Sequence, residues 1–185
     1  MDYLEECIRE YGDAVYRFCC NQTRNRYEAE ELYQDTFLCV MENQKKFKKV
    51  KNPKCYILGV ALNLERNRRR KQARRRRIMP MTSQQVHTAD GEQVDALEFA
   101  DPSGREVVQD VICQEIQQRI WMEITALPER YCDVLCLFYG NELTVTEIAQ
   151  VLKVPEGTVK TRLYQARKRL KERLEGEGYD GTEFG

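Results

Sequence analysis

The stretch NPKCYILGVALNLERNRRRKQARRRR occupies residues 52–77 and decides how the chain is organised. Its first half is apolar at helical spacing and opens with Pro53, which suits the first turn of a helix because the missing N–H is not needed there. Its second half carries nine Lys or Arg residues against one Glu. So many like charges on a few turns repel one another unless a polyanion neutralises them. The stretch predicts a helix that binds nucleic acid, with a solvated basic surface as the plainer alternative.

Acidic segments flank this basic stretch, so the formal net charge of zero is a sum of opposed blocks. Residues 1–44 hold ten acids and four bases, residues 45–77 one acid and fifteen bases, and residues 78–104 five acids and no base. Such a distribution binds a polyanion at one place on the chain without coating the whole protein in it.

Helical spacing of apolar residues recurs on both sides of the basic stretch. Before it, the pattern predicts helices over residues 2–21 and 27–42, the second with a free acidic face, and then a short basic loop over 47–52. Residues 79–104 lose the periodicity and are predicted to form an acidic linker. Helical spacing resumes from residue 107 onward. We therefore expect an all-α fold of two small helical domains, residues 1–78 and 105–175, followed by a disordered tail over 176–185.

The second domain ends in the layout of a helix-turn-helix. Thr144 and Glu147 form a capping-box pattern that starts a short helix, and the turn after it leads into a longer helix. The apolar positions of that longer helix share one arc. The opposite arc is polar, cationic and aromatic, as in a helix that enters the major groove. Side chains on this face suited to bases or phosphates are Thr158, Lys160, Thr161, Arg162, Tyr164, Gln165, Arg167, Lys168 and Arg169.

The eight cysteines do not indicate disulfides, because no signal peptide is expected before an acidic N-terminus and cytosolic thiols stay reduced. Most are predicted to be small core residues, with a redox role for Cys19 and Cys20, or for Cys132 and Cys136, as the lesser alternative. The single histidine, His87, has no cysteine near it, so neither a metal site nor a cofactor is expected. No apolar run is long enough to span a bilayer, so no direct membrane insertion is expected.

Three segments resemble conserved regions 2 and 4 of bacterial sigma factors. They are EAEELYQDTF (28–37), NPKCYILGVALNLERNRRR (52–70) and LPERYCDVLCLFYGNELTVTEIAQVLKVPEGTVKTRLYQARKRLKERL (127–174). With no room for the other sigma domains, the chain resembles the extracytoplasmic-function (ECF) group of the sigma-70 superfamily. The resemblance implies a cytoplasmic protein that binds core RNA polymerase and directs it to promoters. It also implies an anti-sigma factor as a further partner, which can hold such a protein at the membrane.

The resemblance also implies roles for particular residues. Region 2 would dock on the clamp helices of the largest polymerase subunit through Glu31, Gln34 and Asp35. Its basic helix would open the minus-10 element and hold an extruded base of the non-template single strand, with Asn63 in the base pocket. Further minus-10 residues would be Tyr56, Arg66, Asn67, Arg69, Arg70, Lys71 and Arg74. Region 4 would read the double-stranded minus-35 element through Thr158, Lys160, Thr161, Arg162, Tyr164, Gln165 and Lys168.

Four positions depart from the residues that are frequent in the family. Gly59 stands where Arg is frequent, Tyr56 where Trp is frequent, Asn67 where Asp is frequent, and Gln165 where a basic residue is frequent. These departures bear on which promoter bases the protein prefers and on how strongly it melts DNA.

Two other classes of function stay open on the residues alone. A helix-turn-helix regulator that acts without polymerase would need a sensor or dimer module in residues 1–77, which offer neither a phosphoacceptor fold nor a ligand-binding strand pattern. An arginine-rich RNA-binding adaptor would leave the second domain unexplained. An enzyme is not expected, because no Gly-rich phosphate loop, nucleophile elbow or metal-ligand spacing provides catalytic residues.

Overall fold

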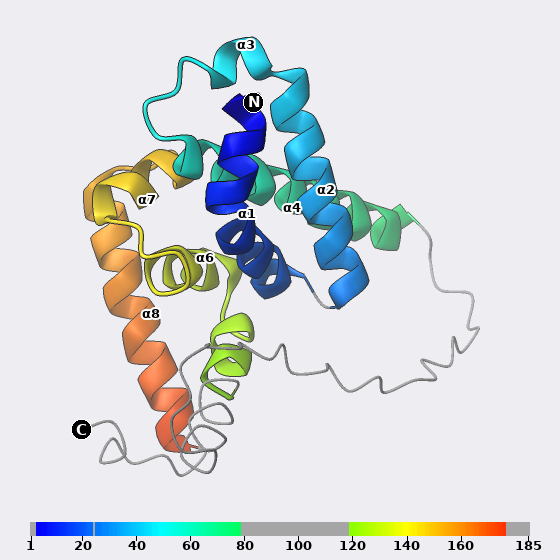
Figure 1. Ribbon diagram of the computed structural model, residues 1–185. Helices are drawn as coiled ribbons and strands as arrows, with labels where there is room; N and C mark the ends of the chain where they lie inside the picture. The colour runs from blue at the N-terminus through cyan, green and yellow to red at the C-terminus, as the bar shows by residue number, and fades with distance from the viewer. Residues whose placement is uncertain (1–2, 24, 79–118, 177–185) are drawn as a thin grey trace, which may run out of the picture. The chain divides into compact units, whose positions relative to one another are not determined.

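The computed structural model describes residues 3–23, 25–78 and 119–176 of the chain. Regular structure in these residues is entirely helical, which confirms the predicted all-α class (Figure 1). The chain divides into two compact units, Met1–Ala96 and Leu97–Gly185. The predicted linker and residues 177–185 of the predicted tail lie outside the described residues, so the predicted domain limits stay predictions. No described helix is both long enough and apolar enough to cross a membrane.

The N-terminal unit consists of three long helices and one short helix. They are α1 (Tyr3–Gln22), α2 (Arg26–Glu42), α3 (Gln44–Phe47) and α4 (Pro53–Ile78). Helices α1, α2 and α4 pack against one another around a shared buried core (Figure 1). Its largest completely buried side chains include Phe18, Phe47, Ile57, Leu58 and Leu62. Where the sequence predicted a helix limit, it agrees with the ends of α1, α2 and α4 to within about one residue. Helix ends cannot be defined more closely than that.

Local side-chain caps set where two of these helices begin. The Asn25 side chain accepts a hydrogen bond of 2.8 Å from the Glu28 N–H, which caps α2. The Asn52 side chain accepts one of 3.1 Å from the Cys55 N–H in the first turn of α4. Each cap satisfies an N–H that the helix itself leaves without a partner. The length of α4 therefore follows from a capped start and an uninterrupted helical sequence after Pro53.

The segment before α4 is more ordered than the basic loop that the sequence predicted over residues 47–52. Phe47 ends α3 and is fully buried. Its ring lies 5.5 Å from that of Tyr3 and 5.5 Å from that of Tyr56, measured between centroids. Tilted aromatic pairs at this distance are favourable. Phe47 thus fixes the start of α4 against the N-terminus of the chain, and the loop is confined to the residues after it.

The C-terminal unit contains a helical segment at 119–125 followed by α6 (Glu129–Phe138), α7 (Val145–Leu152) and α8 (Glu156–Gly176). The predicted capping box is present at the start of α7. The Thr144 side chain accepts from the Glu147 N–H, and the Glu147 carboxylate accepts from the Thr144 N–H at 2.8 Å. Lys153 adopts a left-handed conformation at φ 55° and ends α7. The helix, tight turn and longer helix of the predicted helix-turn-helix are confirmed.

Five of the cysteines lie in the two cores: Cys7, Cys19, Cys55, Cys132 and Cys136. Burial raises the pKa of the Cys19 thiol to about 12, so this thiol stays protonated near neutral pH. Burial also raises the pKa of Cys20. A protonated thiol is a poor nucleophile, which disfavours the redox alternative for this pair.

We expect Cys19 to resist alkylation in the folded chain. With a pKa of about 12, only roughly one thiol in ten thousand is ionised at pH 8. Timed treatment with iodoacetamide and peptide mapping by mass spectrometry should therefore leave Cys19 unmodified while the less buried Cys39 reacts, and urea should remove the difference. Modification of Cys19 at equal rates with and without urea would contradict this account.

Candidate nucleic-acid interface

Helix α4 changes character along its length. Its first half buries Ile57, Leu58 and Leu62 in the core of the N-terminal unit, and Asn63 points outward from the same segment. Beyond these residues the helix carries the basic run. The run is therefore attached to a rigid, buried root, which is how a folded domain positions charged side chains on its surface.

Glu65 is the acid within that basic run, and it is 4% exposed. Two arginines neutralise its carboxylate. Arg69 Nε donates a hydrogen bond of 2.9 Å to Oε1, and Arg68 Nε lies 3.1 Å from Oε2 as an ion pair. Burying a carboxylate without a partner is costly, so both arginines at the base of the run turn toward it.

Arg68 and Arg69 also tie α4 to the two neighbouring helices. Arg68 Nη2 lies 2.8 Å from a Glu28 carboxylate oxygen, and its Nη1 lies 3.2 Å from one of Glu31. Arg69 Nη2 donates to the main-chain carbonyl of Gln22 at the end of α1. The prediction that the acidic face of α2 is free is therefore wrong at Glu28 and Glu31, because Arg68 reaches across to both.

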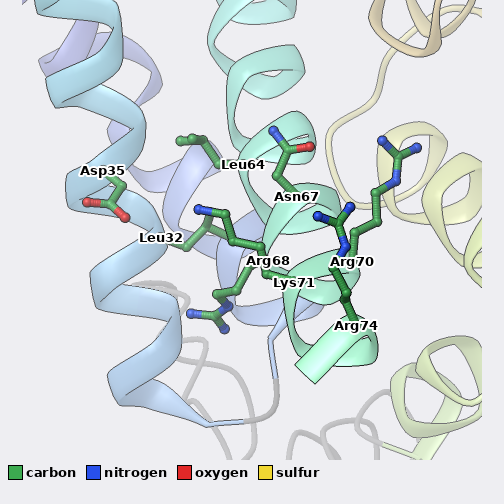
Figure 2. A pocket seen from close by; sticks show the side chains of 8 residues that line it. All are labelled: Leu32, Asp35, Leu64, Asn67, Arg68, Arg70, Lys71 and Arg74. Carbon is green, nitrogen blue, oxygen red and sulfur yellow. The ribbon is translucent and has the colours of Figure 1, made fainter. Parts of the chain in front are cut away.

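A groove of 520 Å³ lies between α2 and α4 (Figure 2). Helix α2 contributes Leu32 and Asp35. Helix α4 contributes Leu64, Asn67, Arg68, Arg70, Lys71 and Arg74. Two leucines supply apolar surface and four cations outnumber one carboxylate, an arrangement suited to an anionic chain with apolar faces. The structure thus brings Asp35, predicted to face polymerase, beside Asn67, Arg70, Lys71 and Arg74, predicted to face DNA.

The other predicted residues of the N-terminal unit lie outside this groove. Tyr56 is half-buried against Phe47, and Asn63 is exposed nearer the start of α4. Glu31 and Gln34 are exposed on α2. The sequence predicted that both Arg68 and Arg69 belong to the basic run that holds the DNA backbone, and it named Arg69 among the minus-10 residues. The signal that distinguishes these two arginines is Glu65, placed three and four residues before them on one helix face.

Helix α8 buries its apolar side and leaves its polar and cationic side open, as the spacing of its residues predicted. Val159, Leu163 and Ala166 are buried. The side chains predicted to face DNA are exposed or half-buried: Thr158, Lys160, Thr161, Arg162, Tyr164, Gln165 and Lys168. Tyr164 is 67% exposed. A large aromatic ring left this open on a cationic face is available to stack on or contact a base.

Two arginines that the sequence grouped with phosphate-binding residues lie over aromatic rings instead. The Arg167 guanidinium carbon is 5.3 Å from the ring centroid of Phe138 and 5.6 Å from that of Tyr139. That of Arg169 is 5.1 Å from the Tyr131 centroid. Such contacts are attractive within about 6 Å. Arg167 and Arg169 therefore help to fix α8 on α6.

Comparisons with known families agree with the two units. The model "Sigma-70 region 2" matches residues 7–75, and the model "Sigma-70, region 4" matches residues 117–170. The first span runs from within α1 to within α4, and the second runs from just before the 119–125 helical segment to within α8.

Two relatives extend over nearly the whole chain. The ECF RNA polymerase sigma factor SigW of Bacillus subtilis (strain 168) is 28% identical, covering 94% of this chain and 89% of its own length. SigM of the same organism is 26% identical, covering 91% of this chain and 93% of its own.

Solved structures share the fold. The sigma factor RpoE from Bartonella quintana, in complex with the anti-sigma factor NepR, gives a TM-score of 0.66 at 20% identity, covering 92% of this chain and 96% of that chain. CnrH, in complex with the cytosolic domain of CnrY, gives 0.64 at 15% identity, covering 94% and 88%.

Matches to regions 2 and 4 in this order define a sigma factor, a class of non-enzymatic proteins that confer promoter specificity on RNA polymerase. The chain belongs to the sigma-70 superfamily and, within it, to the ECF group. It binds core RNA polymerase and directs promoter-specific initiation of transcription, which confirms the function predicted from the sequence.

Replacing Glu65 by Ala should destabilise the N-terminal unit by about 2 kcal/mol, less than a fully buried pair because Arg68 and Arg69 are partly exposed. Trp121 reports the C-terminal unit alone, since it is the single tryptophan. In urea unfolding of Glu65→Ala, the N-terminal unit should therefore unfold at a lower urea concentration than in the wild type, as measured by far-UV circular dichroism. The midpoint measured by tryptophan fluorescence should stay unchanged.

Glu42→Gln on the exposed end of α2 is the matched control, and it should change the free energy of unfolding by less than about 0.5 kcal/mol. If Glu65→Ala and Glu42→Gln gave the same curves, the ion-pair network would not hold α4 in place.

Proposed function

We propose that the N-terminal unit carries both polymerase docking and the opening of the minus-10 element, and that the C-terminal unit reads the minus-35 element as duplex. The observation that carries this proposal is the groove between α2 and α4. One wall holds Asp35 and the other holds Asn67, Arg70, Lys71 and Arg74. A protein that must contact polymerase and melted DNA together needs the two surfaces adjacent and rigidly joined.

Polymerase docking is assigned to the exposed face of α2. Gln34 and Asp35 are exposed there, and Leu38 and Met41 are each 52% exposed on the same helix. Exposed apolar side chains beside a polar, acidic rim are typical of a protein interface. Glu31 belongs to this surface as well, although its carboxylate also pairs with Arg68.

Opening of the minus-10 element is assigned to α4. Asn63 is exposed and can exchange hydrogen bonds with the edge of an unpaired base. Tyr56 supplies an aromatic neighbour whose ring is held by Phe47. Arg70, Lys71 and Arg74 neutralise the displaced backbone, with Arg66 on the same helix. Arg69 pairs with Glu65 on α4 and donates to the Gln22 carbonyl of α1. It therefore holds α4 against α1, and its contribution to DNA binding is indirect.

Reading of the minus-35 element is assigned to the outer face of α8. In a helix-turn-helix, residues at the start of the second helix reach base edges in the major groove. Thr158, Lys160 and Thr161 lie in the first two turns, with Tyr164 and Gln165 one turn further on. Arg162 and Lys168 are placed for the phosphates on either side.

An anti-sigma factor is the proposed regulatory partner. Two proteins of the same fold were solved in complexes, one with an anti-sigma factor and one with a partner's cytosolic domain. A partner that covers the face of α2 and the groove would block polymerase and DNA together. We place this activity in the cytoplasm, where polymerase lies, with no catalytic step of its own and with membrane attachment only through such a partner.

Run-off transcription with core polymerase and a promoter library tests the proposed function. With core polymerase, the purified chain should start transcription from promoters that share two sequence elements, a minus-10 element that is melted and a minus-35 element that stays duplex. A chain that binds duplex DNA alone, yet neither binds core polymerase nor starts transcription at any promoter, would support the helix-turn-helix regulator instead.

Replacing Asn63 by Ala should lower the rate of promoter opening about tenfold, the effect of losing one base contact worth about 1.4 kcal/mol. Affinity for core polymerase should stay within about twofold, because Asn63 lies on α4 and not on the α2 face. Permanganate footprinting measures opening, and fluorescence anisotropy with labelled protein measures polymerase binding.

The matched control for Asn63 is Gln72→Ala, which removes an exposed amide of α4 outside the groove and should leave both measurements unchanged. Equal losses of opening and polymerase binding in Asn63→Ala would remove this residue from the base-pocket role.

A further inference from the structure

A hydrogen bond joins the first turns of the two helices in the helix-turn-helix. Thr146 Oγ1, near the start of α7, donates to Glu156 Oε1, at the start of α8, over 2.8 Å. Ten residues separate the two in sequence, and both side chains are exposed. Helix α7 thus orients the Glu156 carboxylate. This carboxylate lies at the N-terminal end of α8, the end that approaches base edges in a helix-turn-helix.

Helix stability alone explains only part of this arrangement. An acid at the first turn interacts favourably with the helix dipole, which accounts for Glu156 as a residue type. It does not account for the hydrogen bond to α7. Within residues 119–176 the carboxylate has no ion pair, although Lys160 follows one turn later on the same helix. A carboxylate at the start of a helix that approaches DNA lowers affinity for phosphate, so its place there calls for a different contact.

The chemistry of the major groove supplies that contact. Cytosine presents its exocyclic N4 amine there as a donor, and a carboxylate is the side chain that accepts from it. One oxygen of Glu156 takes the Thr146 hydroxyl, and the other, Oε2, has no partner within the described part of the chain. A carboxylate held by one oxygen is fixed in direction and can accept with the second.

We propose that Glu156 determines specificity by accepting a hydrogen bond from a cytosine of the minus-35 element, and that Thr146 is its positioning residue. This inference rests on the proposed function of α8. It adds the base that Glu156 recognises and the side chain, Thr146, that positions Glu156. Guanine is disfavoured at the same place because its N7 and O6 are acceptors that would face a carboxylate.

The test uses the full chain with core polymerase and a library of promoters randomised across the minus-35 element, read by sequencing the run-off transcripts. The wild-type chain should favour cytosine at one position. Glu156→Ala should reduce that preference about tenfold or more while leaving the other positions unchanged. Glu156→Gln should move the preference toward adenine, because an amide both donates to N7 and accepts from N6.

Thr146→Val keeps the shape of the side chain and removes the hydroxyl, so it should weaken the cytosine preference without replacing it by another base. Glu175→Gln is the matched control, since it removes a carboxylate at the far end of α8 and should leave every position unchanged.

Two results would overturn the inference. One is a Glu156→Ala chain whose base preferences match the wild type at every position, with only a uniform gain in affinity from the lost negative charge. The other is a Glu156→Gln chain that keeps its preference for cytosine. In both cases the wild-type chain still initiates at library promoters, which separates this failure from a failure of the proposed function, where no promoter would be used.

Discussion

A carboxylate that is 4% exposed on a strongly cationic helix must be neutralised by some of the cations around it. Glu65 imposes this constraint on the N-terminal unit. It draws in Arg68 and Arg69, and these in turn bind α2 through Glu28 and Glu31 and α1 through the Gln22 carbonyl. The orientation of α4, and with it the DNA-binding surface proposed for this helix, depends on this network.

The network divides the basic run into two parts with different tasks. Arg68 and Arg69 pair with acceptors inside the unit, although Arg68 also lines the groove. Arg70, Lys71 and Arg74 line the groove, whose α2 wall holds Asp35 (Figure 2). The C-terminal unit also uses some of its arginines for internal contacts. Arg167 and Arg169 lie over aromatic rings of α6 and its neighbouring turn. In both units, some arginines fix a helix through ion pairs or ring contacts within the unit, and other polar or cationic side chains are the ones proposed to face the nucleic acid.

The sequence was sufficient for the helices and for the outer face of α8, because apolar periodicity and caps such as Thr144 with Glu147 are local signals. It was not sufficient for contacts between helices. The pairing of Arg68 with Glu28 crosses forty residues, and the groove joins residues of α2 and α4 that no spacing rule relates. Phe47 was missed as a core residue because its neighbours are basic and polar, while its burial depends on Tyr3 and Tyr56. The functional class could be predicted because its motifs are contiguous, whereas individual site residues depend on such tertiary contacts.

The central claim, that the basic run splits into internal and DNA-facing arginines, is tested most directly by the salt dependence of promoter binding. The holoenzyme would be assembled with Arg69→Ala, Arg70→Ala or Arg74→Ala, and the slope of log K against log salt compared with wild type. Loss of one phosphate contact with the displaced single strand should reduce the magnitude of the slope by about 0.7 for Arg70→Ala and Arg74→Ala. Arg69→Ala should keep the wild-type slope and lower the stability of the N-terminal unit. A slope reduced equally by all three substitutions would contradict the account.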